Sequence, residues 1–188
     1  MSFNHNLRDL SPKQQLAFAA AIAERMLPNY QLFSSRTDDD AHLKVRAILD
    51  TVWEHLTIRG SRIDFAKQAE KLQELVPDTV GDESLGSYLA LDTSLAVDHC
   101  LQLLLQADDE QVVSISRLSR ASVARFLEVT EPETAEGRLS EQPLMQYEHE
   151  CQNEILAFVQ AHESSPNDMK ALRQMIKEQE VSSIGIER

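Results

Sequence analysis

Glycine, proline and cysteine are scarce in this sequence. Five Gly and six Pro among 188 residues leave little turn-forming material for a β-sandwich or a β-barrel. The two cysteines, Cys100 and Cys151, each lie in a stretch that is apolar at helical spacing, which is typical of reduced core residues. They also cannot supply the paired Cys-x-x-Cys units of a structural zinc site. We therefore expect a protein built mainly of α-helix.

Long apolar runs are missing as well. The longest, from Leu16 to Ala23, is eight residues, far short of the roughly 20 that a membrane helix needs. The first five residues do not form a basic segment followed by an apolar one, as a secretory signal does. We therefore expect a cytoplasmic protein that does not enter a membrane.

Basic residues are few in the second part of the chain. The formal net charge is −13, from 18 basic and 31 acidic side chains. Residues 1–75 hold ten of each sign, so residues 76–188 carry the whole acidic excess, and between Glu128 and Glu163 nine acids accompany one base, Arg138. Such a surface repels nucleic-acid phosphates and anionic membranes, so neither partner is expected. It can serve solubility alone, offer an acidic face to a basic protein partner, or mimic nucleic acid.

Apolar residues recur at the three- and four-residue spacing of α-helices. Ser11 can cap a first helix and Pro12 suits its first position, whereas Pro28 is expected to end it. Asp64 and Ser165 are expected caps for later helices. The expected helical segments are 12–27, 29–33, 38–60, 64–76, 85–107, 112–129, 144–161 and 165–176, with 108–110 between two helices and 131–142 irregular.

The predicted fold class is all-α, a single-domain multi-helix bundle of seven or eight helices. Residues 1–188 form one helical domain, of which 181–188 are a C-terminal tail that can dock in an extended form. Residues 85–107 are apolar nearly all round, as in a helix surrounded by others. We therefore place that helix at the centre of the bundle.

The motifs of common catalytic and metal sites are absent from the sequence. None of the six histidines follows a Glu by three residues, as a di-iron bundle requires, and Asp39-x-x-His42 comes nearest. The run from Glu148 to Cys151 is rich in ligand types, but adjacent helical residues point in different directions. A Gly-rich phosphate loop, a Gly-x-Ser-x-Gly elbow and the pattern around a phosphotransfer histidine are missing too. We therefore predict no metal, no cofactor and no catalytic residue.

Polar residues on otherwise apolar helices are the candidate site residues. Because a buried charge is costly unless it is paired, Arg25 is expected to form an internal ion pair with Asp92 or Glu54. The candidates form either a structural network or the wall of a pocket. They are Arg25, Tyr30, Trp53, Glu54, Asp92 and His99.

A second cluster of interest is the only basic concentration in the acidic half. Arg117, Arg120 and Arg125 lie there among three serines. These arginines either pair with nearby acids on an exposed face or contact an anion or a partner.

Six short segments, spread along nearly the whole chain, form a specific pattern. They are 15–18 (Gln-Leu-Ala-Phe), 24–30 (Glu-Arg-Met-Leu-Pro-Asn-Tyr), 48–50 (Ile-Leu-Asp), 53–57 (Trp-Glu-His-Leu-Thr), 88–92 (Tyr-Leu-Ala-Leu-Asp) and 183–186 (Ser-Ile-Gly-Ile). In combination they resemble the YjaG-like family, a bacterial domain of unknown function. Ser183 departs from the pattern, since that family often shows Asn before Ile-Gly-Ile. The resemblance implies an all-helical cytoplasmic protein without an established activity, linked through gene context to histidine-kinase signalling.

Two functions follow as hypotheses. The first is a non-catalytic interaction or regulatory protein with an unidentified protein partner, which the acidic half and the histidine-kinase link favour. The alternative is a small-molecule-binding protein or an enzyme with a pocket between helices. The sequence does not predict the oligomeric state.

Overall fold

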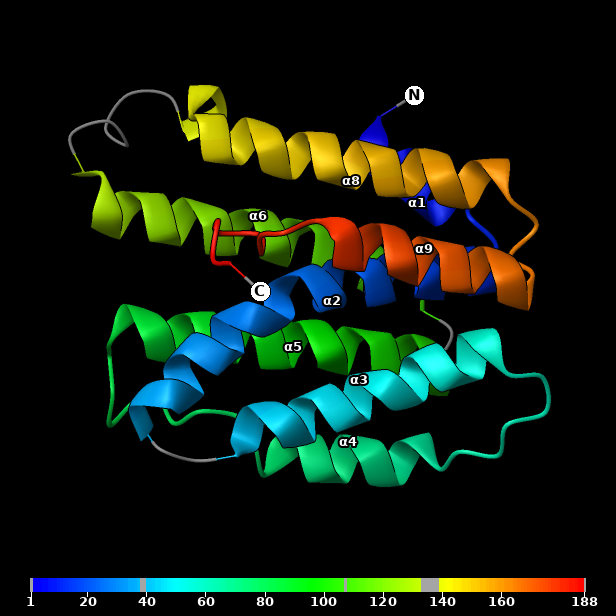
Figure 1. The fold of residues 1–188 in the computed structure, drawn as a ribbon, viewed down its shortest axis with the longest axis horizontal. Coiled ribbons are helices and arrows are strands. Elements are labelled where there is room, and N and C mark those ends of the chain that lie inside the picture. The colour runs from blue at the N-terminus through cyan, green and yellow to red at the C-terminus, as the bar shows by residue number, and fades with distance from the viewer. Residues whose placement is uncertain (1, 38–39, 107, 133–138, 188) are drawn as a thin grey trace.

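Eight α-helices account for most of the residues that the computed structural model describes, which are 2–37, 40–106, 108–132 and 139–187 (Figure 1). They are α1 (Phe3–Arg8), α2 (Pro12–Thr37), α3 (Ala41–Thr57), α4 (Phe65–Gln73), α5 (Leu85–Gln106), α6 (Glu110–Thr130), α8 (Pro143–Ala161) and α9 (Pro166–Glu178), with the 3-10 turn η1 at Leu139–Glu141. The predicted all-α bundle is confirmed. The expected acidic helix start at 38–39 and much of the expected irregular stretch, 133–138, lie outside the described residues.

The helices α2 and α5 form the centre of the bundle. α2 packs along α5 and also contacts α3, α6, α8 and α9, so it lies between two groups of helices (Figure 1). Every residue of the run Ala17–Ala23 is fully buried, and its small alanines let the neighbouring helices approach closely. The predicted central position of the 85–107 helix is correct, but α2 shares it. No helix of the described ranges has both the length and the apolar character of a bilayer-crossing segment.

The helix α2 continues through Pro28, so the prediction that this residue ends the helix was wrong. Proline cannot donate a backbone hydrogen bond and crowds the preceding turn, so α2 bends near its middle instead of stopping (Figure 1). Two carbonyls of this turn have partners outside the helix. Met26 O accepts from Thr93 Oγ1 at 3.1 Å, and Arg25 O accepts from Ser183 N at 3.2 Å. The short helix expected after residue 29 is therefore the second half of α2.

Helix starts follow the expected capping chemistry. Asp64 Oδ1 accepts from Lys67 N at 3.0 Å at the start of α4. Ser165 and Asp168 form a reciprocal capping box at the start of α9, with distances of 2.8 and 3.2 Å. The predicted caps are confirmed at both helices.

The C-terminal tail docks on α2 as a tight loop. Val181 and Glu187 form an isolated antiparallel bridge around a turn in which Gly185 has a φ of +78°, a conformation that favours glycine. Asn29 Nδ2 donates to Ser183 Oγ at 3.1 Å, and the Ile184 side chain is buried. The expected docking of the tail is confirmed, in a turned rather than a fully extended form.

Candidate functional site

A fully buried ion pair joins α2 to α8. Arg25 donates from Nη1 to Glu148 Oε2, and from Nε to Gln179 Oε1 at 2.9 Å. The other carboxylate oxygen of Glu148 accepts from Ser119 Oγ and from Gln152 Nε2, both at 2.6 Å. Desolvation is the largest single effect and opposes the charge of Arg25, but Glu148, Cys151 and Tyr147 together outweigh it and raise the pKa of the guanidinium. This pair holds its two helices together because each charge compensates the other away from water.

The partner of Arg25 differs from the predicted Asp92 or Glu54. Helical periodicity shows which residues face inward but not which helix lies opposite, and α8 rather than α5 or α3 presents a carboxylate to Arg25. Prediction from the sequence missed Glu148 and Gln152. Their spacing of four residues on one helix face, opposite the serines of α6, is the signal that could have revealed them.

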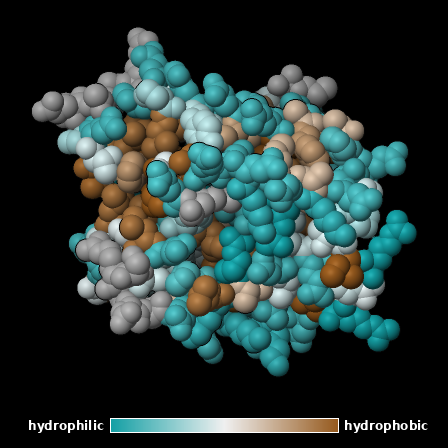
Figure 2. All heavy atoms as spheres, in the orientation of Figure 1, coloured by the Kyte–Doolittle hydropathy of each residue, from teal (hydrophilic) through white to brown (hydrophobic). Residues whose placement is uncertain are grey.

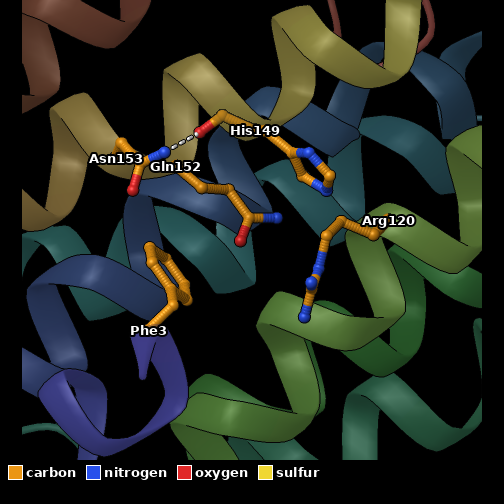
Figure 3. Close-up of a pocket in the computed structure, with 5 residues that line it drawn as sticks. All are labelled: Phe3, Arg120, His149, Gln152 and Asn153. Carbon is orange, nitrogen blue, oxygen red and sulfur yellow. Dashed lines mark hydrogen bonds between the residues drawn. The ribbon is translucent and has the colours of Figure 1, made fainter. Parts of the chain in front are cut away.

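A pocket of about 240 Å³ lies beside this network, between α1, α6 and α8 (Figure 3). We call it the α1/α6/α8 pocket, and it is lined by Phe3, Arg120, His149, Gln152 and Asn153. In Figure 3 the Phe3 ring and the Arg120 guanidinium lie on opposite sides of it, with the Gln152 amide between them. The pocket therefore combines an apolar wall with a cationic one.

A second buried network joins α2, α3 and α9. Glu24 accepts from Arg46 Nη1 at 2.7 Å and from the indole Nε1 of Trp53 at 3.0 Å. The guanidinium of Arg173 lies 5.4 Å from the centroid of the Trp53 ring and pairs with Asp50. Trp53 is fully buried in this network, which does not include Arg25.

A third network joins α5 to α6. Asp92 is buried and lies 3.7 Å from Arg125 Nε, and the Arg125 guanidinium lies over the Tyr88 ring at 4.7 Å. Burial raises the pKa of the Asp92 carboxyl above its ordinary value, although Arg125 and Ser122 act in the opposite direction.

This shift predicts how Asp92 changes the stability of the fold with pH. The pKa of Asp92 is higher in the folded protein than the ordinary 3.8 of the unfolded chain, so at pH values between these two pKa values the folded protein binds more protons. The free energy of unfolding therefore falls as the pH rises through that window. We expect Asp92→Asn, which mimics the protonated side chain, to have a higher free energy of unfolding than the unsubstituted protein at pH 7. The gain should shrink as the pH falls toward 4. Urea unfolding at a series of pH values measures it, and a variant less stable at pH 7 would contradict the prediction.

The remaining three predicted site residues lie apart from one another. Tyr30 donates its hydroxyl to Leu75 O at 2.5 Å, and the ring of His99 shares a hydrogen bond of 2.7 Å with Gln111 Oε1. Glu54 is exposed. The six candidates thus belong to separate networks and surfaces, and the described structure does not bring them together around one cavity.

Titratable side chains do not gather into a metal-binding group within the described ranges. Three or more His, Cys, Asp or Glu residues are not found together there in a ligand arrangement, and Asp39, the nearest sequence candidate, lies outside those ranges. Cys100 and Cys151 are buried free thiols, and burial raises the pKa of both.

A partly exposed apolar patch lies at the end of the bundle where α6, η1 and the tail meet. Its base is a buried cluster formed by Leu89, Val123, Leu127, Met145 and Ile184. The side chains at its surface, with the exposed Val129, form what we call the α6–tail patch, consisting of Leu85, Ala124, Phe126, Val129, Leu139, Leu144 and Ile186. Figure 2 shows apolar atoms gathered at the left of the view, where α5 begins and α6 ends in Figure 1.

Comparison with known proteins places the chain in a family. It matches the family model "Protein of unknown function (DUF416)" over residues 2–187. It is 33% identical over 185 residues to an uncharacterised protein of Haemophilus influenzae, covering 96% of this chain and 94% of that protein. It is 32% identical over 184 residues to the uncharacterised protein YjaG of Escherichia coli, covering 96% and 93%. The crystal structure of a DUF416 family protein from Shewanella baltica matches it with a TM-score of 0.91 at 28% identity over both whole chains. The YjaG-like resemblance is confirmed, and the chain belongs to the DUF416 family of proteins of unknown function.

Proposed function

We propose that this chain is a non-catalytic regulatory protein that binds a basic amphipathic segment of a protein partner on the α6–tail patch. The observation that carries the proposal is an apolar surface whose residues have exposed acids beside them along the chain. Val129 on the last turn of α6 is 59% exposed and lies beside Phe126, three residues earlier on the helix. Contiguous apolar surface of this kind is a common mark of a protein interaction site.

The charge around the patch selects the chemistry of the partner. The exposed acids Glu128, Glu131, Glu141 and Glu187 each lie within two residues of a side chain of the patch. The nearby Arg125 is directed to Asp92 and Tyr88. A helix with apolar residues on one face would pack them on the patch, and Lys or Arg beside that face would be attracted to these acids.

A role through binding fits the other sequence indications. The family resemblance implies an association with histidine-kinase signalling, in which a regulatory protein acts by contacting another protein. We place this activity in the cytoplasm, where the two free thiols stay reduced.

A model peptide tests the proposal without knowledge of the natural partner. The probe is a fluorescent Lys/Leu peptide of about five helical turns whose leucines form one face. We expect saturable binding by fluorescence anisotropy. Val129→Lys should weaken it by about tenfold, because a charge then enters the contact surface.

Matched controls separate binding at this patch from nonspecific attraction of the basic peptide to the acidic protein. Leu105 is 44% exposed and lies near the other end of α5, about 24 Å along the helix axis from Leu89. Leu105→Lys therefore places a lysine at an exposed apolar position away from the patch. Its affinity for the peptide should match that of the unsubstituted protein. Equal binding of a Glu/Leu peptide, or equal weakening by the two substitutions, would refute the proposal.

A further inference from the structure

The α1/α6/α8 pocket has at its wall a partly buried cation, Arg120, that forms no direct ion pair with the described residues. Of the two guanidinium groups near Glu148, Arg25 takes one carboxylate oxygen directly. The other oxygen accepts from Ser119 and Gln152. Arg120 therefore adds a cation for which the buried network holds no second carboxylate. A charge that is partly removed from water is stabilised by an opposite charge nearby, so this wall favours an anion.

The side chain of Arg120 is positioned for such a contact. Its Nε donates to Ser116 O at 3.3 Å, one turn earlier on α6, which holds the guanidinium along α6 on the side of the pocket opposite Phe3 (Figure 3). Burial lowers the pKa of Arg120, an effect that Glu148 opposes and Arg117 reinforces. The terminal nitrogens of a guanidinium match the two oxygens of a carboxylate, with which they form paired hydrogen bonds.

The other walls define the rest of the ligand. Phe3 supplies an aromatic surface opposite Arg120, and His149 and Asn153 lie at the edge of the pocket (Figure 3). Gln152 is already held by Ser116 and Glu148, so it forms a fixed floor. The volume of about 240 Å³ is smaller than the roughly 300–1,000 Å³ of pockets for drug-sized ligands. A small molecule with one charged end and one apolar part fits these limits.

We propose that the α1/α6/α8 pocket binds a small organic carboxylate, held by Arg120 through paired hydrogen bonds and covered on its apolar side by Phe3. This site is independent of the α6–tail patch. It uses the basic group of α6, for which the sequence left open either pairing with acids or contact with an anion.

Calorimetric titration with benzoate tests the site, because benzoate carries one carboxylate on one ring. We expect saturable binding to the full chain, and Arg120→Gln should weaken it by at least about tenfold through loss of charged hydrogen bonds. Arg117→Gln removes the same charge from an exposed position one turn earlier on α6 and should leave the affinity within about twofold. A circular-dichroism spectrum and melting curve of each variant establish that it is folded.

Two further ligands make the test specific. Benzamide has the shape of benzoate without its charge and should not bind measurably, and inorganic phosphate, which has no apolar part, should bind more weakly than benzoate. Absence of saturable benzoate binding, equal binding by Arg120→Gln, or a preference for phosphate would each overturn the proposal.

Discussion

Replacing Glu148 with alanine should lower the free energy of unfolding by about 3–5 kcal/mol, because it leaves Arg25 as an uncompensated charge inside the bundle. Both side chains are fully buried, so water cannot replace the lost partner. Ser119 and Gln152 would also lose the acceptor that they share. Urea unfolding followed by circular dichroism measures the change.

Two comparisons show whether the buried charge causes this loss. Glu150 is exposed on the same helix, and Glu150→Ala should change stability by less than about 0.5 kcal/mol. A double variant, Arg25→Met with Glu148→Met, removes both charges and should recover part of the stability lost in Glu148→Ala. A loss below about 1 kcal/mol in Glu148→Ala would mean that the ion pair does not hold α2 to α8.

Replacing Trp53 with alanine should have an effect of similar size on the other side of α2. The side chain is fully buried, and a buried Trp→Ala change costs about 3–5 kcal/mol through lost burial and the cavity that remains. The indole also donates to Glu24 and lies beneath Arg173, so its loss disturbs the contacts of α3 with α2 and α9. Thermal and urea unfolding should both show the loss.

The variant Trp53→Phe separates packing from hydrogen bonding. It keeps an aromatic ring but cannot donate to Glu24, which still accepts from Arg46 at 2.7 Å. We expect it to lose less than half as much stability as Trp53→Ala. Equal losses in the two variants would show that the hydrogen bond, and not the ring, carries the effect.

The sequence predicted the architecture well because helix formation depends on local patterns. Apolar spacing located the helices, and the side chains of Asp64 and Ser165 marked two of their starts correctly. Pro28 shows the limit of such reasoning. Its effect on the helix depends on Thr93 and Ser183, which lie far away in sequence and donate hydrogen bonds to the carbonyls at the bend only after folding.

The polar contacts could be predicted only in part. Periodicity identified Arg25, Trp53 and Asp92 as polar or amphipathic groups on inward faces, and all three are buried. Their partners depend on which helices are neighbours, which a single sequence does not specify. The ion pair of Arg25 with Glu148, 123 residues apart, is the clearest case.

The segments that carry the family resemblance serve mainly to join helices. Glu24, Arg25 and Asn29 lie within seven residues on α2, yet they bind α3, α8 and the tail respectively. The α6–tail patch uses mostly other residues. Motif residues of this kind therefore stabilise the fold, and the proposed α6–tail patch lies mostly outside them.

The most direct test of the proposed function is to map the bound Lys/Leu peptide by amide chemical shifts of the isotope-labelled protein. We expect the largest changes within residues 124–131, 139–145 and 184–187, around the acids and apolar side chains of the patch. Changes centred on α3 and α4, or spread evenly over the surface, would contradict it.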